Sequence, residues 1–461
     1  MKEKTKIFKR ISSEILYREG HFAPQVFCGE AGLVFAATNL RYMNQLGIEC
    51  IEGARKESLD QTNLPAPMVR PKNLGCLRFE FTPDQMAPPT EERKRCAIPG
   101  DVVVSKLLPI KASWATRNVI RHPVDANCLI IRGLSKPWGL WVALHLNHWA
   151  YEAYFFRRGG AAIIPRIGLK DLCQTPIADL HPEAEALSWK LEELLDEESL
   201  LRQTFFRRQQ EVERLVDENQ AVQSWRKMKA RFANVQKCDF YRPQEIGDSW
   251  LPQQVASSRF QTAMQGNDDW EPMSALLSFQ SNSQARFRDF SLHGRILRLK
   301  DVAISFAPVI GVWEELPEAL FRLYRDPVRD GEVLLSLLAT SPRVTYAVGP
   351  FPEPVHIVDH WARLSFRETP GAWALLLNTP VVAEQMALLA SGSSRQFIRI
   401  QDLGKISLPI VALEIRRQWE EQIRRDMRKR SDLEQQFQKL LARAWELFDE
   451  AHPVLQKRRS S

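Results

Sequence analysis

Two pairs of histidines have a spacing that could serve metal binding or catalysis. The segment "HIVDH" places His356 and His360 at the i,i+4 spacing of a zinc-binding helix. The segment "HLNH" places His145 and His148 three residues apart. Neither pair has an evident third ligand, and the glutamate that metalloproteases use as a base does not follow the first histidine of "HIVDH". We therefore expect surface or hydrogen-bonded core histidines and no metal site.

The motifs of nucleic-acid enzymes are also incomplete. A magnesium-dependent nuclease needs an aspartate and a distant Glu-x-Lys triplet, but Val104 stands where "PGDVVVSK" would need the second acid. We therefore expect Asp101 to be a turn residue. A DNA adenine methyltransferase needs an Asn/Asp-Pro-Pro-aromatic loop, whereas the sequence has only "APPTEE" at Pro88–Pro89, and a P-loop is absent. The sequence predicts a non-enzymatic chain with no cofactor of its own.

Length and composition indicate the class of protein to which this chain belongs. The chain has 461 residues, of which 44% are hydrophobic and 26% charged, as is typical of a soluble protein of several domains. Its net charge of +7 permits a polyanionic partner without requiring one. The seven cysteines form no CxxC pair, which indicates reduced thiols. We expect no membrane span, no secretory signal and a cytoplasmic location.

Two long stretches predict amphipathic helices. The first runs from His181 to Arg231 and contains no glycine and no proline after Pro182. The second runs from Ile410 to Glu450. Apolar residues recur at approximate three-four spacing in both, which is an imperfect heptad pattern. We expect the two helices to pair as an antiparallel coiled coil.

The segments that precede these helices occur twice. The sequence "GDVVVSKLL", which begins at Gly100, recurs as "GEVLLSLLA" from Gly331, and "ALHLN" recurs at the same offset as "ALLLN". At a slightly larger offset, "IPRIGLKDLCQTPI" matches "FIRIQDLGKISLPI", which pairs Ile167 with Ile400 and Arg166 with Arg399. The β-branched runs "DVVVS", "CLIIRG", "EVLLS" and "VHIVD" predict strands bounded by turns. The chain is therefore interpreted as a tandem duplication of a mixed domain and a helix.

These repeated segments, each followed by a long helix, resemble the specificity subunits of type I restriction–modification systems. The resemblance rests on "GDVVVSK" and "GGAAIIPRIGLKDLCQTPI" and on their repeats "GEVLLSL" and "GSSRQFIRIQDLGKISLPI", and it covers residues 95–232 and 325–450. The double proline and the Glu-Gln pair that often begin the helix in that family are absent, so the chain resembles a divergent member. In that family each mixed domain reads one half of a split DNA sequence, and the helices space the domains and dock two methyltransferase subunits.

The resemblance implies an α+β fold with two mixed α/β target-recognition domains in tandem, each followed by a long helix. The predicted boundaries are 1–178 and 233–408 for the two recognition domains, 179–232 and 409–450 for the spacer helices, and 451–461 for a basic tail. The expected partners are double-stranded DNA and two methyltransferase subunits that carry S-adenosylmethionine, with no membrane. Whether restriction or translocase subunits also join is left open.

DNA contact requires cations and amide side chains at loops and groove edges. The candidates cluster around the family-like segments, and each could equally be a solvated surface charge: Lys106, Lys111, Arg117, Arg121, Arg157, Arg158, Arg343, Ser394, Arg395 and Gln396. Two alternatives to a type I specificity subunit stay open. One is a DNA-recognition subunit of another phage-defence system, and the other is a coiled-coil scaffold without sequence-specific DNA binding.

Overall fold

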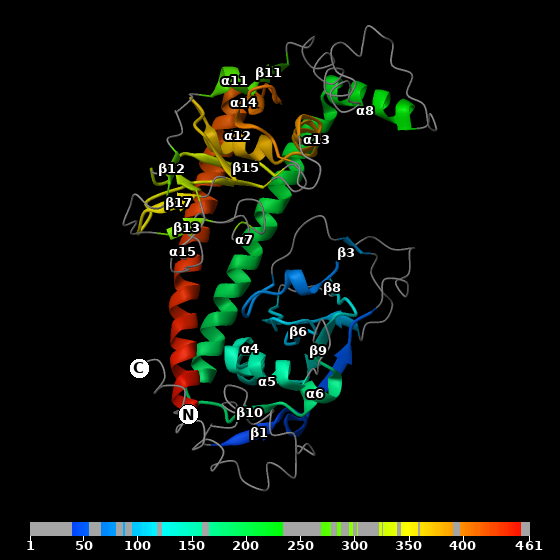
Figure 1. Cartoon of the computed structure of the whole chain (residues 1–461), viewed down its shortest axis with the longest axis vertical. Coiled ribbons are helices and arrows are strands. Elements are labelled where there is room, and N and C mark those ends of the chain that lie inside the picture. Colours follow the sequence, from blue (N-terminus) through cyan, green and yellow to red (C-terminus); the bar gives the residue numbers. More distant parts are fainter. Residues whose placement is uncertain are drawn as a thin grey trace. The chain divides into compact units, whose positions relative to one another are not determined.

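The computed structural model describes fifteen stretches of the chain (Figure 1). They are residues 39–54, 66–79, 86–87, 95–117, 122–158, 166–233, 269–277, 284–286, 295–297, 302, 322–324, 326–338, 343–357, 360–390 and 397–452. The chain forms two compact units. Unit 1 consists of Met1–Leu200 and Gln435–Ser461, and unit 2 consists of Leu201–Glu434. Each unit thus contains segments from both of the long helices.

The centre of unit 1 is a four-stranded antiparallel sheet with the order β2-β9-β6-β7. These strands are Glu49–Glu52, Cys128–Arg132, Val102–Ser105 and Ala112–Trp114. The runs "DVVVS" and "CLIIRG" were expected to be strands, and this is confirmed. All four residues of β6 are buried. Val103 packs against Val69, Leu74 and Val124, and helix α4 (Lys136–Asn147) packs on β6 and β7.

Shorter elements surround this sheet in unit 1. Strand β1 (Leu40–Tyr42) pairs with β10 (Pro176–Ala178) directly before the first long helix. The other elements are η2 (Met43–Leu46), β3 (Ala66–Pro67), η4 (Pro71–Asn73), β4 (Met86–Ala87), β5 (Cys96–Ala97), β8 (His122–Pro123), α5 (Trp149–Arg158) and α6 (Leu169–Cys173).

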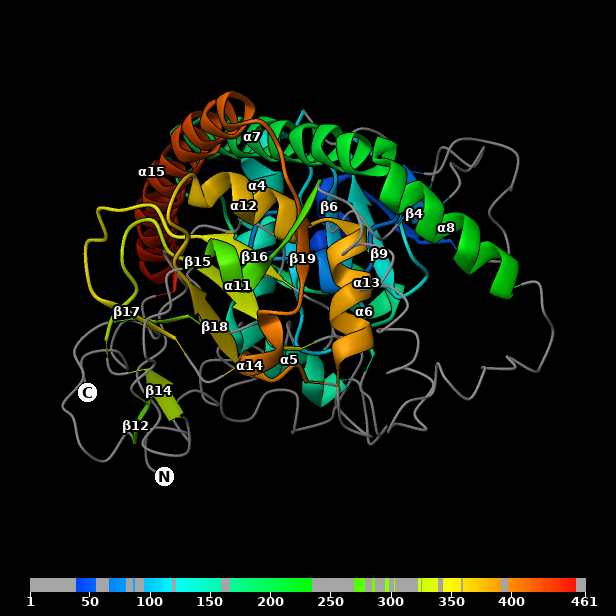
Figure 2. The same cartoon turned by 90° about the horizontal axis from the view of Figure 1, so that it is seen from above.

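Unit 2 has a three-stranded antiparallel sheet with the order β16-β15-β18, whose strands are Val344–Tyr346, Val333–Ser336 and Trp361–Leu364. Helix α12 (Pro370–Leu377) packs on this sheet, and α13 (Pro380–Leu389) follows it (Figure 2). The expected strands in "EVLLS" and "VHIVD" are confirmed as β15 and as β17 (Val355–Ile357). The remaining elements are β11 (Trp270–Pro272), α11 (Met273–Leu276), β12 (Gln284–Arg286), β13 (Arg295–Leu297), β14 (Arg322–Tyr324), α14 (Ile400–Leu403) and β19 (Ser407–Pro409).

The second predicted long helix is confirmed as α15 (Leu413–Ala451), with 39 residues. The first was predicted to be continuous, but it is divided into α7 (Ala184–Glu218) and α8 (Gln220–Ala233). The division lies at Asn219, whose Oδ1 accepts hydrogen bonds from the backbone N–H of Ala221 and from Nε1 of Trp270, both at 3.0 Å. An asparagine that accepts from the second residue of the next helix is an N-cap, so a new helix starts there.

The same backbone contacts recur in the two units. The N–H of Gly100 donates to the carbonyl of Ala115 at 2.8 Å, and the N–H of Gly331 donates to that of Ala347 at 2.8 Å. Strand β11 pairs with β19 in unit 2 as β1 pairs with β10 in unit 1. These correspondences fall at nearly the offset that relates Gly100 to Gly331, so these contacts recur at the spacing of the repeated segments.

The structure corrects the alignment that was predicted for the last of the repeated segments. The N–H of Ile167 donates to the carbonyl of Lys106 at 2.9 Å, and the N–H of Ile398 donates to that of Leu337 at 3.0 Å. Ile167 therefore corresponds to Ile398, and the pairings of Ile167 with Ile400 and of Arg166 with Arg399 were wrong. Strand register is set by these backbone bonds and by the burial of the isoleucine, not by the identity of the neighbouring arginine.

Among the described residues, no single helix is both long and apolar enough to cross a membrane. The pair α12 and α13, bent by 72° at the break between them, passes the same test of length and composition together. Seven of the eight residues of α12 are buried, and the helix packs on β15, β16 and β19 of unit 2. Its apolar composition is accounted for by this packing.

Candidate functional site

An ion pair with a buried carboxylate lies at the start of β6 in unit 1. Asp101 is 1% exposed and follows Gly100, which has a φ of +95°. Its carboxylate accepts hydrogen bonds from the N–H of Ile98 at 2.9 Å and from Nε and Nη2 of Arg132 at 3.0 and 2.7 Å. Asp101 therefore closes a turn and pairs with a partly buried arginine, as expected of a turn residue.

The same ion pair recurs in unit 2. Glu332 follows Gly331, which has a φ of +84°, and accepts a hydrogen bond from the N–H of Arg329 at 3.0 Å. Nε and Nη2 of Arg363 donate to the Glu332 carboxylate at 3.1 and 2.5 Å. In the internal repeat, Glu332 and Arg363 stand at the positions of Asp101 and Arg132. The pair thus supports the fold of both units and leaves neither carboxylate open to a ligand.

The histidines of "HLNH" are core residues. His145 is fully buried, and its Nδ1 lies 2.8 Å from the carbonyl oxygen of Trp141. Its Nε2 lies 3.3 Å from Nε2 of His452, near the end of α15. The ring of Phe448 stacks on His148 at 4.3 Å and on His452 at 4.4 Å between centroids. Burial lowers the pKa of His145 well below its usual value and that of His452 to about 3, so these two rings are neutral.

The spacing of "HIVDH" is not realised on a helix. His356 lies in strand β17 and is 5% exposed. Among the residues that the structure describes, no group of three or more histidine, cysteine, aspartate or glutamate side chains could hold a metal ion.

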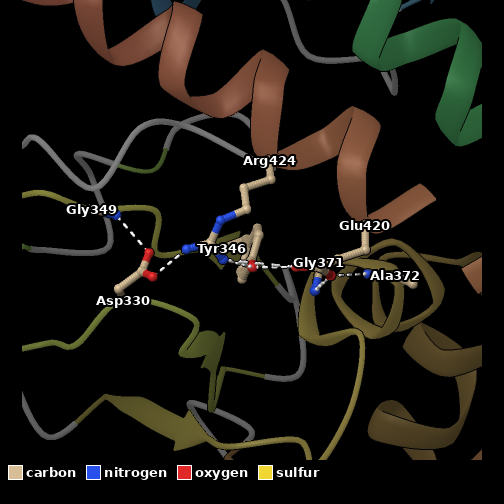
Figure 3. Close-up of polar contacts among 7 residues, drawn as sticks. All are labelled: Asp330, Tyr346, Gly349, Gly371, Ala372, Glu420 and Arg424. Carbon is tan, nitrogen blue, oxygen red and sulfur yellow. Dashed lines mark hydrogen bonds and ion pairs between the residues drawn. The ribbon is translucent and has the colours of Figure 1, made fainter. Parts of the chain in front are cut away.

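Helix α15 is attached to the core of unit 2 by a network of polar contacts (Figure 3). Glu420 accepts a hydrogen bond from the Tyr346 hydroxyl at 2.5 Å and from the N–H groups of Gly371 and Ala372 at 2.5 and 3.3 Å. Because these N–H groups belong to the first turn of α12, the carboxylate stabilises the positive end of that helix. Glu420 thus joins α15 to α12 and to the end of β16.

One turn further along α15, Arg424 extends the network. Its Nη1 donates to the Tyr346 hydroxyl at 2.8 Å, and its Nη2 forms an ion pair with Asp330. Asp330 is itself held by the N–H of Gly349 at 2.8 Å. We call Asp330, Tyr346, Glu420 and Arg424 the unit 2 joint.

Gly371 allows this close contact between helix and core. A Cβ atom at this position would lie 2.6 Å from Cγ2 of Ile423 and 2.8 Å from both Oε2 of Glu420 and Cε1 of Tyr346. Any side chain larger than hydrogen would therefore push α12 away from α15.

A similar set of contacts attaches α7 to the core of unit 1. Nζ of Lys136, at the start of α4, pairs with Glu192 at 2.7 Å, and Nε of Arg117 pairs with Asp196 at 2.8 Å. Lys136 also lies 3.9 Å from the centre of the Trp189 ring. We call Arg117, Lys136, Glu192 and Asp196 the unit 1 joint.

The cations predicted to contact DNA have varied surroundings. Lys106 pairs with Glu52 at 2.9 Å, and Arg117 belongs to the unit 1 joint. Arg158 is 3% exposed, pairs with Asp171 and donates to Gln174 at 2.9 Å, so it packs α5 against α6. Arg121, Ser394, Arg395 and Gln396 lie outside the described residues.

Lys111 and Arg343 occupy equivalent positions. The N–H of Ser105 donates to the carbonyl of Lys111 at 2.9 Å, and the N–H of Ser336 donates to that of Arg343 at 2.8 Å. Each cation therefore lies where the loop between two neighbouring strands closes, directly before β7 in unit 1 and before β16 in unit 2. Arg343 is half-buried, and this burial lowers its pKa. Within the described part of the chain, Lys111 and the exposed Arg157 make no ion pair.

Sequence reasoning missed most of the two joints. Glu192 and Asp196 on α7, and Glu420 and Arg424 on α15, are ionisable pairs with i,i+4 spacing. The second pair follows the first at close to the offset of the repeated segments. Comparison of the charged positions of the two helices at that offset could have found them.

No family model matches this chain, and no curated protein matches it in sequence. Solved structures do match it in fold, and three of them follow. The crystal structure of a type I restriction–modification S subunit from M. genitalium is 12% identical, with a TM-score of 0.38, and the match covers 90% of this chain and 95% of that one. The HsdS subunit from Thermoanaerobacter tengcongensis is 13% identical, with a TM-score of 0.25, over 90% and 96% of the two chains.

The third structure comes from a study of complex assembly and conformational transition of the type I R-M system. It is 14% identical, with a TM-score of 0.25, over 91% and 96% of the chains. The family that the sequence motifs resemble is therefore also the family of these neighbours. Because all three TM-scores lie below 0.5, the likeness by itself assigns no function to this chain.

Proposed function

We propose that this chain is the DNA-recognition subunit of a type I restriction–modification complex. In this proposal the central sheets of units 1 and 2 belong to two target-recognition domains in tandem, each reading one half of a split sequence. The chain itself is non-catalytic, and S-adenosylmethionine is bound by two methyltransferase subunits that dock on it. The domain boundaries at residues 178 and 408 remain predictions, close to the ends of β10 and β19.

The recurring contacts are the observation that carries the proposal. The buried carboxylate–arginine pair, the turn glycine before it and the strand pair β1–β10 or β11–β19 are present in both units. Each set leads into a long helix. Two copies of one recognition domain are what a bipartite DNA site requires, since each half-sequence needs a reader of its own.

Contacts between α7 and α15 support an antiparallel pairing of the spacer helices. In unit 1, Glu183 just before α7 pairs with Arg443 at 2.8 Å. In unit 2, Arg208 pairs with Asp426. Residues later along α7 thus contact residues earlier along α15, which is the order of an antiparallel pair.

The equivalent cations Lys111 and Arg343 are proposed to contact DNA, one in each half-site. Both lie beside the loop between two neighbouring strands, from which a long side chain can reach a phosphate or a base edge. Binding to phosphates displaces condensed counterions, so affinity should fall steeply with salt.

Selection of random duplex DNA with the pure full-length chain tests the proposal. We expect enrichment of two short sequences at a fixed separation. Lys111→Gln should relax or weaken one of them and Arg343→Gln the other, and each should reduce the slope of log affinity against log salt by about 1. Lys190→Gln, which neutralises an exposed cation on α7, is the matched control and should leave both half-sequences unchanged.

Enrichment of no sequence by the wild-type chain would overturn the proposal and favour a coiled-coil scaffold. Sequencing the methylome of a host with and without the gene tests the modification role separately. Unchanged methylation alongside bipartite DNA selection would favour a recognition subunit of another defence system.

A further inference from the structure

The helix–core contacts of the two units occupy similar places, and one contact in each unit has its charges reversed between the units, whereas the equivalent residues Glu192 and Glu420 are both acidic. In unit 2 the helix contributes the cation Arg424 and the core contributes Asp330. In unit 1 the helix contributes the anion Asp196 and the core contributes Arg117. Asp196 and Arg424 are separated along the sequence by the same interval as Glu192 and Glu420.

We infer that the two joints are matched by charge, so that Asp196 and Arg424 are positioning residues that hold each core on its own helix at the angle needed to read its half-site. The inference rests on the proposed function and names what determines the separation of the two half-sequences.

The two joints contact equivalent parts of the two cores. Arg117 follows β7 by three residues, and Tyr346 ends β16, which corresponds to β7. Lys136 is the first residue of α4, and Gly371 lies in the first turn of α12. Each helix thus contacts its core near the end of one strand and at the start of the covering helix. Two contacts to different elements fix rotation as well as distance.

Charge makes the joints non-interchangeable. If the core of unit 2 lay on α7, Asp330 would face Asp196, and if the core of unit 1 lay on α15, Arg117 would face Arg424. Like charges at these distances repel, so each core is disfavoured on the other helix. Opposite charges also favour each core on its own helix. Arg424 and Asp330 are 28% and 48% exposed, so solvent weakens their attraction. The pair therefore contributes more to the orientation of the core than to its stability.

A small rotation of a core on its helix has a large effect on DNA reading. Successive base pairs are separated by about 3.4 Å along the helix axis. A displacement of a recognition surface by that distance therefore changes the separation of the half-sequences by one base pair.

Charge reversal in the full-length chain tests the inference. The variants are Arg424→Glu, Asp330→Arg and the double variant with both changes, and the readout is selection of random duplex DNA. We expect each single variant to keep both half-sequences but to spread over two or more separations. Affinity for the wild-type separation should fall about tenfold. The double variant should restore a single separation. Arg425→Glu reverses the charge of the neighbouring exposed residue and is the matched control.

A merely structural role gives a different result. Amide exchange at Gly371 and Ala372, whose N–H groups donate to Glu420, reports on the attachment of α15. Faster exchange in the single variants with an unchanged separation of half-sequences would overturn the inference. So would a double variant that behaves no better than the single variants. If the wild-type chain selects no sequence at all, the proposed function fails and the positioning role fails with it, while exchange in the double variant still shows whether the joint charges are matched.

Discussion

Removing the Glu332 carboxylate should destabilise unit 2 more than any surface change. Glu332 and Arg363 form an ion pair whose side chains are 5% and 8% exposed. In Glu332→Ala the guanidinium stays in place, because Nη1 and Nη2 still donate to the carbonyls of Asp326 and Pro327 at 2.9 and 3.1 Å. Its charge then has no carboxylate partner. The variant thus isolates the effect of an unpaired buried cation.

The expected magnitude follows from the burial of the pair. Removing one member of a buried ion pair costs about 3–5 kcal/mol. The N–H of Arg329 also loses its acceptor, which costs about 1 kcal/mol if water does not replace it. The two remaining carbonyl partners of Arg363 reduce the first figure. We therefore expect Glu332→Ala to lower the free energy of unfolding of unit 2 by about 3 kcal/mol.

Urea denaturation followed by hydrogen exchange at the amides of β15 and β18 measures this loss in unit 2 alone. Glu368→Ala, which removes an exposed glutamate from the same unit, is the control and should change stability by less than about 0.5 kcal/mol. Replacing both members of the pair by methionine should recover most of the loss, because no charge is then left unpaired. A loss below about 1 kcal/mol, or a double variant as unstable as Glu332→Ala, would refute this reasoning.

Three further outcomes are expected. Gly371→Ala should cost about 1–3 kcal/mol and lower the melting temperature, since its Cβ would meet Ile423 at 2.6 Å. The contribution of His452 to the stability of unit 1 should be constant above the ordinary histidine pKa of 6.5 and fall as the pH is lowered toward about 3. Burial holds His452 neutral down to its folded pKa of about 3, whereas the unfolded chain binds that proton near pH 6.5. Urea midpoints at pH 7 and pH 5 check this, and His452→Phe should flatten the difference. Asn219→Ala should cost about 1 kcal/mol and speed amide exchange in α8 but not in α7.

Four of the strands and the long helices could be predicted because their signal is local. The apolar runs of β6, β9, β15 and β17 and the three-four spacing of α7 and α15 are visible within a few residues. The division at Asn219 was missed because the helical pattern continues through it, and the cap depends partly on Trp270, 51 residues away. The order of elements was therefore easier to predict than their ends.

The candidate site was harder to predict because a cation's role depends on distant partners. Arg117 has the sequence surroundings of a DNA-contacting loop residue, yet its partner Asp196 lies 79 residues further along the chain. Tyr346 and Glu420 are 74 residues apart, and neither belongs to a motif. The internal repeat reduces the number of candidate DNA-contacting residues, because positions that recur in both halves, such as Lys111 and Arg343, can be compared directly in the sequence.

The division of the chain between the two units sets the order in which they can be completed during synthesis. Unit 2 is one continuous stretch, Leu201–Glu434, whereas unit 1 needs Gln435–Ser461 in addition to Met1–Leu200. The core around His145 and His148 therefore lacks Phe448 and His452 until translation has passed residue 452. The half that is translated first is the half that finishes folding last, and a nascent chain that stalls just before Gln435 carries an incomplete unit 1 with its aromatic contacts unmade.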